Sequence, residues 1–124
     1  MATDLTLTLA NEPGTLQKVG EVLGSAGINI DGICGVAEGA SGAVHILVAD
    51  GAMARESLSQ AGIECGPERE VEVVSVVDQP GELGRHLRRV ADAGVNVDLI
   101  YLAAGTRLVL GSSDVEGLRR ALHA

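Results

Sequence analysis

Apolar and polar residues alternate near the start of the chain, and this alternation predicts a strand. Leu5, Leu7 and Leu9 are each separated by a threonine, as in a strand that buries one face. A helical period follows from about residue 13, with apolar positions at Leu16, Val19, Leu23 and Ala26. Gly27 then marks the end of this helix, because glycine adopts the left-handed conformation that terminates many helices.

The same pattern predicts the remaining elements of the chain. Strands are expected at about 28–37 and 44–49, followed by a helix at 52–61 and a strand at 63–70. The second half repeats this order, with a strand at 71–77, a helix at 80–93, strands at 95–103 and 107–111, and a helix at 114–123. We therefore expect the second half to lack a counterpart of the strand at 63–70.

The two halves are copies of one sequence unit. Residues 11–16 read Asn-Glu-Pro-Gly-Thr-Leu, and residues 78–83 read Asp-Gln-Pro-Gly-Glu-Leu. Pro13 recurs as Pro80 after 67 residues. Asn29 recurs as Asn96 after the same interval of 67. Two separated blocks with one offset indicate an internal repeat. A later pair of aspartates, at 50 and 114, is 64 residues apart, which indicates that three residues were lost in between.

This element order predicts an α+β fold. It corresponds to a ferredoxin-like βαββαβ unit repeated twice, with an antiparallel sheet and helices on one face. We expect one module at 1–70 and a second at 71–124 that lacks its last strand. The short connection between the copies also leads us to expect one continuous sheet with all the helices on one side.

The repeated motifs resemble those of the ACT domain family. They are Pro-Gly-x-Leu at the first strand–helix turn and Ala-Gly-(Ile/Val)-Asn-(Ile/Val) at the second strand. The resemblance covers nearly the whole chain, which looks like the stand-alone tandem kind. It implies a small regulatory or sensing protein that binds an amino acid or a similar small metabolite and acts on a partner enzyme. It also implies ligand sites between paired modules, formed by Asn11, Gly14, Thr15 and Leu16 with Asn96, and by Asp78, Gly81, Glu82 and Leu83 with Asn29.

The two Pro-Gly turns suit a ligand carboxylate, because the first N–H groups of a helix are unpaired and carry partial positive charge. Gly14 and Gly81 leave room for close approach of the ligand. The alternative is that proline and glycine serve only the geometry of a helix start. Asn29 and Asn96 offer a donor and an acceptor to a zwitterionic ligand, or they tie down the turn after each helix.

Asn11 and Asp78 hold the same repeat position but differ in charge. An aspartate pairs with an ammonium group, whereas an asparagine only hydrogen-bonds it. Capping of the following helix is the alternative role for both residues. If both sites exist, they are therefore expected to differ.

Composition narrows the possible partners. Nine Lys and Arg face seventeen Asp and Glu, and the net charge of −8 disfavours nucleic acid and anionic membranes. Tyr101 is the single aromatic residue, so the chain has no platform for stacking bases. The start shows no signal-peptide pattern, and no apolar run approaches the roughly 20 residues of a membrane span. We therefore expect a cytoplasmic protein. Cys34 and Cys65 lack metal-ligand spacing, and we expect two free thiols, with a disulfide as the alternative.

No residue pattern predicts catalysis, a metal site or a cofactor. The histidines are scattered over different predicted elements, the arginines of 85–89 are expected on a solvated helix face, and Ser112-Ser113-Asp114 is expected to cap the last helix. We therefore expect a protein that is not an enzyme. A ligand-free module that assembles with a partner enzyme is the alternative, and a small enzyme on the same fold is a third possibility.

The strand at 71–77 carries valines on both faces. Val74 and Val76 match core-facing leucines of the first copy, so Val71, Val73 and Val77 are expected on the opposite face. An exposed apolar strip beside an open strand edge indicates a partner surface. We expect a homodimer or larger assembly whose contact involves this strand.

Overall fold

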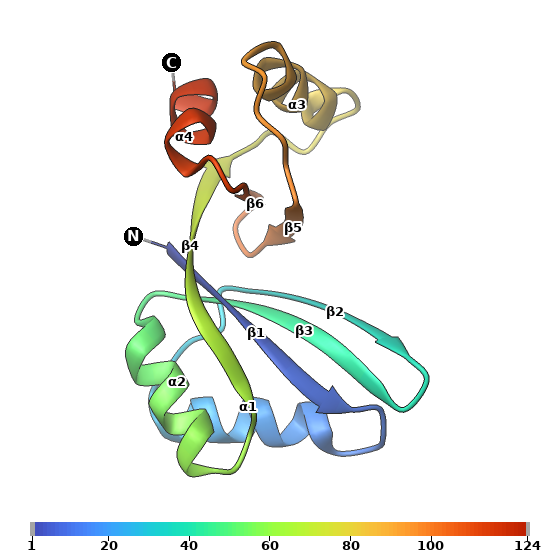
Figure 1. Cartoon of the computed structure of the whole chain (residues 1–124), viewed down its shortest axis with the longest axis vertical. Coiled ribbons are helices and arrows are strands. Elements are labelled where there is room, and N and C mark those ends of the chain that lie inside the picture. Colours follow the sequence, from blue (N-terminus) through green and yellow to red (C-terminus); the bar gives the residue numbers. More distant parts are fainter. Residues whose placement is uncertain (1, 124) are drawn as a thin grey trace. The chain divides into compact units, whose positions relative to one another are not determined.

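The computed structural model describes residues 2–123 and divides the chain between Arg69 and Glu70 into two compact units (Figure 1). Within the described residues there are four helices, and the strand pairs are antiparallel. The predicted α+β class is therefore confirmed. One continuous sheet across both units stays a prediction.

The first unit begins with the predicted strand–helix–strand–strand–helix order. Its elements are β1 (Ala2–Ala10), α1 (Thr15–Ser25), β2 (Gly32–Glu38), β3 (Ser41–Val48), α2 (Gly51–Gln60) and the start of β4 (Cys65–Ser75). Strand β3 lies between β1 and β2, and β4 begins beside β1.

Both helices of the first unit pack against the same face of its sheet (Figure 1). The leucines that alternate along β1 supply two fully buried side chains, Leu5 and Leu7. Val19 and Leu23 of α1 pack on them, one helical turn apart, as their spacing predicted. The rest of this core comes from β3, from α2 and from the segment that follows α2, namely Val44, Ile46, Val48, Ala54, Leu58 and Ile63.

The second unit repeats the arrangement with the end of β4, α3 (Glu82–Asp92), β5 (Leu99–Ala103), β6 (Arg107–Gly111) and α4 (Val115–His123). Strand β6 lies between β4 and β5. Its core joins Leu108 and Leu110 of β6 to both helices through Val90, Leu118 and Leu122. Val74 and Val76 pack against this cluster, so their predicted direction is confirmed.

The prediction of two separate strands at 63–70 and 71–77 was wrong, because β4 runs without interruption from Cys65 to Ser75. No glycine or proline follows Pro67 before residue 80, and the valines from Val71 onward favour extended backbone. One strand therefore closes the first unit and opens the second. The expected exposed valine strip is also discontinuous, since Val71 is 3% exposed while Val77 is 58% exposed.

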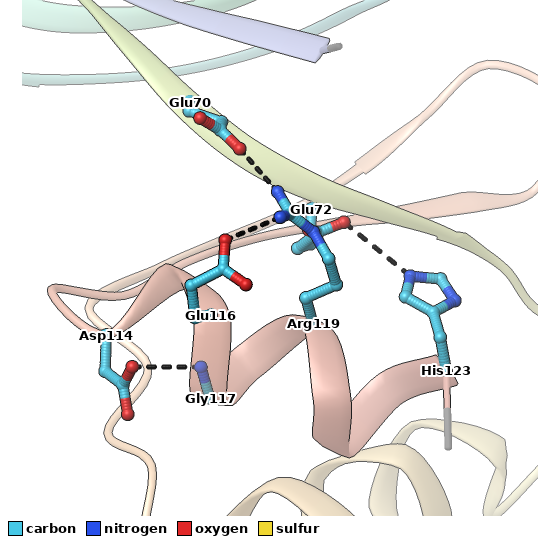
Figure 2. Close-up of polar contacts among 7 residues, drawn as sticks. All are labelled: Glu70, Glu72, Asp114, Glu116, Gly117, Arg119 and His123. Atoms are coloured by element: carbon cyan, nitrogen blue, oxygen red, sulfur yellow. Dashed lines mark hydrogen bonds and ion pairs between the residues drawn. The ribbon is translucent and has the colours of Figure 1, made fainter.

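Helix α4 is fastened to β4 by one arginine (Figure 2). The Arg119 guanidinium donates to Glu72 at 2.5 Å, to Glu70 at 2.5 Å and to Glu116 at 2.7 Å. These hydrogen bonds, with Glu72 first and Glu70 second, raise the pKa of Arg119. His123 Nε2 lies 3.6 Å from the same Glu72.

The N-terminus of α4 is capped as the sequence predicted. Asp114 Oδ1 accepts a hydrogen bond of 2.9 Å from the Gly117 N–H (Figure 2), and Ser112 Oγ accepts one from the Asp114 N–H. In the first unit, Asp50 plays the equivalent role by accepting from the Met53 N–H. The two aspartates of the repeat are therefore helix caps.

Candidate ligand-binding site

The second unit has a cavity of about 500 Å³ where β4 turns into α3. The turn and the start of α3 form one wall, and β5 with the turn after it forms the other. The lining residues are Val76, Val77, Asp78, Gln79, Glu82, Leu83, Ile100, Tyr101, Leu102, Ala103, Thr106 and Leu108.

The first unit has a smaller cavity, of about 280 Å³, at the equivalent place. Its lining residues are Leu9, Ala10, Asn11, Thr15, Leu16, Ile33, Gly35, Val36, Ala37, Gly42 and Val44. Residues that share a repeat position line both cavities, including Asn11 and Asp78, Thr15 and Glu82, Leu16 and Leu83, and Ile33 and Ile100. The sequence repeat is therefore also a repeat of the cavity.

Exposed apolar side chains gather at these two cavities. Among residues 2–123, eight large hydrophobic side chains are exposed, and seven of them line one cavity or the other. The exception is Met53 on α2. Apolar groups concentrated in this way mark a binding surface, because single exposed hydrophobics are normally scattered.

The predicted helix start at Pro13 and Pro80 was two residues early. Helices α1 and α3 begin at Thr15 and Glu82, after N-cap glycines with φ of 93° at Gly14 and 88° at Gly81. No side chain caps either helix. Capping by Asn11 and Asp78, the alternative role for these two residues, is therefore wrong.

We expect Gly81→Ala to lower the free energy of unfolding by about 1–2 kcal/mol, because residues with a Cβ atom are disfavoured in the left-handed conformation. The space itself is open, since no atom lies within 4 Å of an added Cβ. Gly84→Ala is the matched control. It lies inside α3 with equally open space, and it should stabilise the protein by up to about 1 kcal/mol. Urea denaturation measures both, and effects of the same sign would contradict this backbone geometry.

Thr15 and Glu82 close their turns onto the preceding strands by opposite means. The Thr15 hydroxyl donates to the carbonyls of Ala10 and Glu12 at 3.0 and 3.2 Å. Glu82 Oε2 accepts from the N–H of Val77, the repeat equivalent of Ala10, at 2.9 Å. Both predicted site residues therefore hold the wall of a cavity in place.

Glu82 is the centre of a polar cluster on α3. Arg85 donates to its Oε1 from Nε at 3.0 Å and from Nη2 at 2.8 Å, and His86 Nε2 lies 3.3 Å from Oε2. The Val77 N–H hydrogen bond, followed by that of Arg85, lowers the pKa of Glu82 to about 2. This cluster was not predicted from the sequence, although the i, i+3, i+4 spacing on a helix was a signal for it.

Asn11 and Asp78 differ in what they contact. Asn11 Nδ2 donates to the Gly39 carbonyl at 3.0 Å, and its N–H donates to the Ala40 carbonyl at 2.9 Å. The first turn is thereby tied to the β2–β3 turn. Asp78 is exposed, and no donor within residues 2–123 bonds its carboxylate.

Asn29 and Asn96 line neither cavity. Both are exposed and lie in the segments just before β2 and β5. Asn29 Nδ2 donates to Asp31 Oδ1 at 2.6 Å. Contact of either asparagine with a ligand stays a prediction.

A second polar cluster lies on β1 and β3. His45 Nδ1 is 3.0 Å from Oδ2 of the fully buried Asp4 and 3.3 Å from the Thr6 hydroxyl. Cys34 and Cys65 are free thiols. The pKa of the Cys65 thiol is raised, and burial is the largest cause of this shift.

Neither a metal-binding cluster nor a membrane-spanning helix occurs in the part of the chain that the structure describes. No group of three His, Cys, Asp or Glu side chains there could hold a metal ion. No helix there is long and apolar enough to span a bilayer.

No model of a known protein family matches the sequence, and no curated protein matches it. Solved structures do. Protein BT0572 from Bacteroides thetaiotaomicron matches with a TM-score of 0.86 and 24% identity, over 97% of this chain and 85% of that one. The regulatory subunit of aspartate kinase from Thermus thermophilus matches with a TM-score of 0.74 and 22% identity, over 98% and 90% of the two chains. E. coli aspartokinase III, solved in complex with lysine and aspartate, matches with a TM-score of 0.58 and 20% identity, over 98% of this chain and 30% of that one.

The fold of these solved structures thus agrees with the resemblance drawn from the Pro-Gly and Ala-Gly-x-Asn motifs. The matched structures cover nearly all of this chain and include a subunit whose role is regulatory. The chain has the ACT-type fold.

Proposed function

We propose that this chain is a small regulatory protein that binds an amino acid or a similar small metabolite. The observation that carries the proposal is the pair of repeat-equivalent cavities, each at the turn before the first helix of a unit and each lined by exposed apolar side chains. The complex of aspartokinase III with lysine and aspartate supports an amino-acid ligand on this fold.

The proposal extends to the organisation of the chain. Residues 1–70 and 71–124 are two ferredoxin-like ACT modules in tandem, and the chain is a cytoplasmic homodimer that regulates a partner enzyme and has no catalytic activity of its own. Light scattering at micromolar concentration tests the dimer, because a monomer has a mass of 12.6 kDa.

We expect at least one amino acid to raise the melting temperature in a thermal-shift screen. A ligand that binds only the folded state adds about 2.7 kcal/mol of stability at 100 times its dissociation constant. Leu102→Asp should abolish the shift, because Leu102 lines the larger cavity, whereas Met53→Asp should preserve it, because Met53 is also exposed but lines neither cavity.

A ligand-free assembly module is the second candidate function. The exposed apolar side chains that line the cavities favour it, because a partner protein could cover them instead of a small molecule. A screen of all standard amino acids and related amines without any shift would exclude the ligand proposal and leave this one.

A further inference from the structure

We propose that the cavity of the second unit alone takes the ligand, and that it selects a primary amine attached to an apolar body, with the Asp78 carboxylate as the residue that determines specificity. This inference rests on the proposed function and names the ligand class and the unit that binds it. It follows from four differences between two cavities that began as copies.

The first difference is the role of the residue at the mouth of the turn. The Asn11 side-chain amide donates to the Gly39 carbonyl, and its backbone N–H donates to the Ala40 carbonyl. Asn11 therefore joins the two turns that flank its cavity. Asp78 makes no such bond within the described residues and leaves a carboxylate on the cavity wall. The Asn11 side chain is thus occupied in holding its own turn, whereas Glu82 holds the second turn and leaves the Asp78 carboxylate available to a ligand.

The second difference is size. The cavity of the second unit measures about 500 Å³, and that of the first about 280 Å³. Ligand cavities for small molecules in proteins are typically about 300–1,000 Å³. The larger cavity therefore lies within this range and the smaller one falls just below it.

The third difference is charge. Asp78 and Glu82 are the charged residues of the larger lining, and no lysine or arginine belongs to it. Both oxygens of Glu82 are already engaged, by the Val77 N–H and by Arg85, so Glu82 is neutralised and held in place. Within the described residues, Asp78 is left as the unpaired charge of the cavity. An unpaired carboxylate attracts an ammonium group and repels a carboxylate.

The fourth difference is the apolar wall. Leu102 occupies the position that Gly35 holds in the first unit, and with Leu83 and Ile100 it extends the apolar surface of the larger cavity. An aliphatic group that displaces water from these side chains gains free energy in proportion to the buried apolar area. An amine with an aliphatic body thus matches both the charge and the wall of the cavity, and no lining side chain recognises a carboxylate by charge.

Three probes that share one 3-methylbutyl body test this assignment by calorimetry on the full chain. They are leucine, 3-methylbutylamine, which is leucine without its carboxylate, and 4-methylpentanoate, which is leucine without its amine. We expect the amine to bind at least as well as leucine, and the acid to show no binding. Asp78→Asn should weaken binding of the amine by about 10- to 100-fold, the range for loss of a charged hydrogen-bond partner.

Asp92→Asn is the matched control variant, because it removes the same charge from an exposed residue at the end of α3 that lines neither cavity. We expect its affinity for the amine to equal that of the unchanged protein, with circular dichroism to verify that both variants are folded. Binding of leucine that is indifferent to Asp78→Asn, or equal binding of the acid, would overturn this inference and leave the proposed function standing. Failure of leucine, of the amine and of every other standard amino acid to bind would overturn both.

Discussion

Replacing Leu110 by alanine should lower the free energy of unfolding by about 2–5 kcal/mol. Leu110 lies on the central strand β6 of the second unit and is fully buried. It packs with Val90 of α3 and Leu118 of α4. Its truncation therefore leaves a cavity between two helices and the sheet, which can be filled only if these elements move. A domain of this size has a total stability of the order of 5–15 kcal/mol, so the loss is a large share of it.

Leu102→Ala is the control for Leu110→Ala. Both residues are leucines on adjacent strands of the second unit, but the Leu102 side chain is 65% exposed. Its truncation should change stability by less than about 1 kcal/mol. Urea denaturation followed by far-ultraviolet circular dichroism compares the two, since the chain has no tryptophan. A loss below about 1 kcal/mol for Leu110→Ala would show that the core of the second unit lies elsewhere.

Hydrophobic periodicity was enough to predict the elements that bury one face. The leucines of β1 and the helical spacing in α1 predicted the core of the first unit, and the repeat carried the same prediction to Val74 and Val76 in the second. These features depend on local spacing and on burial, which sequence patterns encode directly.

The boundaries were harder to predict because backbone bonds decide them. The strands expected from 28 and 95 begin at Gly32 and Leu99. The preceding segments each make one sheet-directed bond, from the Asp31 N–H to the Leu47 carbonyl and from the Asp98 N–H to the Gly111 carbonyl. The continuity of β4 was also not predicted. The expected module boundary between residues 70 and 71 suggested a break in the strand, but the backbone is continuous there.

The candidate site could be predicted on its turn side only. The Pro-Gly motif identified Asn11, Leu16, Asp78 and Leu83, which line the two cavities. The facing wall on β5, with Ile100 and Leu102, depends on which residues of a distant strand come opposite the turn, and that is a tertiary property. Likewise, the contacts of Glu82 with Val77 and Arg85, which hold the turn, were not predicted, and contact of Glu82 with a ligand stays a prediction.

Glu82→Gln should destabilise the protein at neutral pH, and the destabilisation should disappear in acid. Hydrogen bonds from Val77 and Arg85 lower the pKa of Glu82 from 4.5 to about 2 in the folded chain. A carboxylate with a lowered folded pKa contributes stability that is fully present above its unfolded pKa. That contribution is lost as the pH falls from about 4.5 towards 2, because the folded state must then bind a proton against these bonds. Glutamine retains the shape of the side chain but not its charge, so it lacks the contribution at every pH.

The measurement is the free energy of unfolding in urea from pH 7 to pH 2 for the two proteins. We expect the unchanged protein to be the more stable one above pH 4.5 and the two curves to converge as the pH approaches 2. Glu38→Gln removes one charge from an exposed residue at the end of β2 and serves as the control for net charge. Equal stability of the Glu82→Gln variant and the unchanged protein at neutral pH would mean that the neutral shape of the side chain, and not its ionised hydrogen bonds, closes the turn against β4. In that case Glu82 would resemble Thr15, which holds the equivalent turn without any charge.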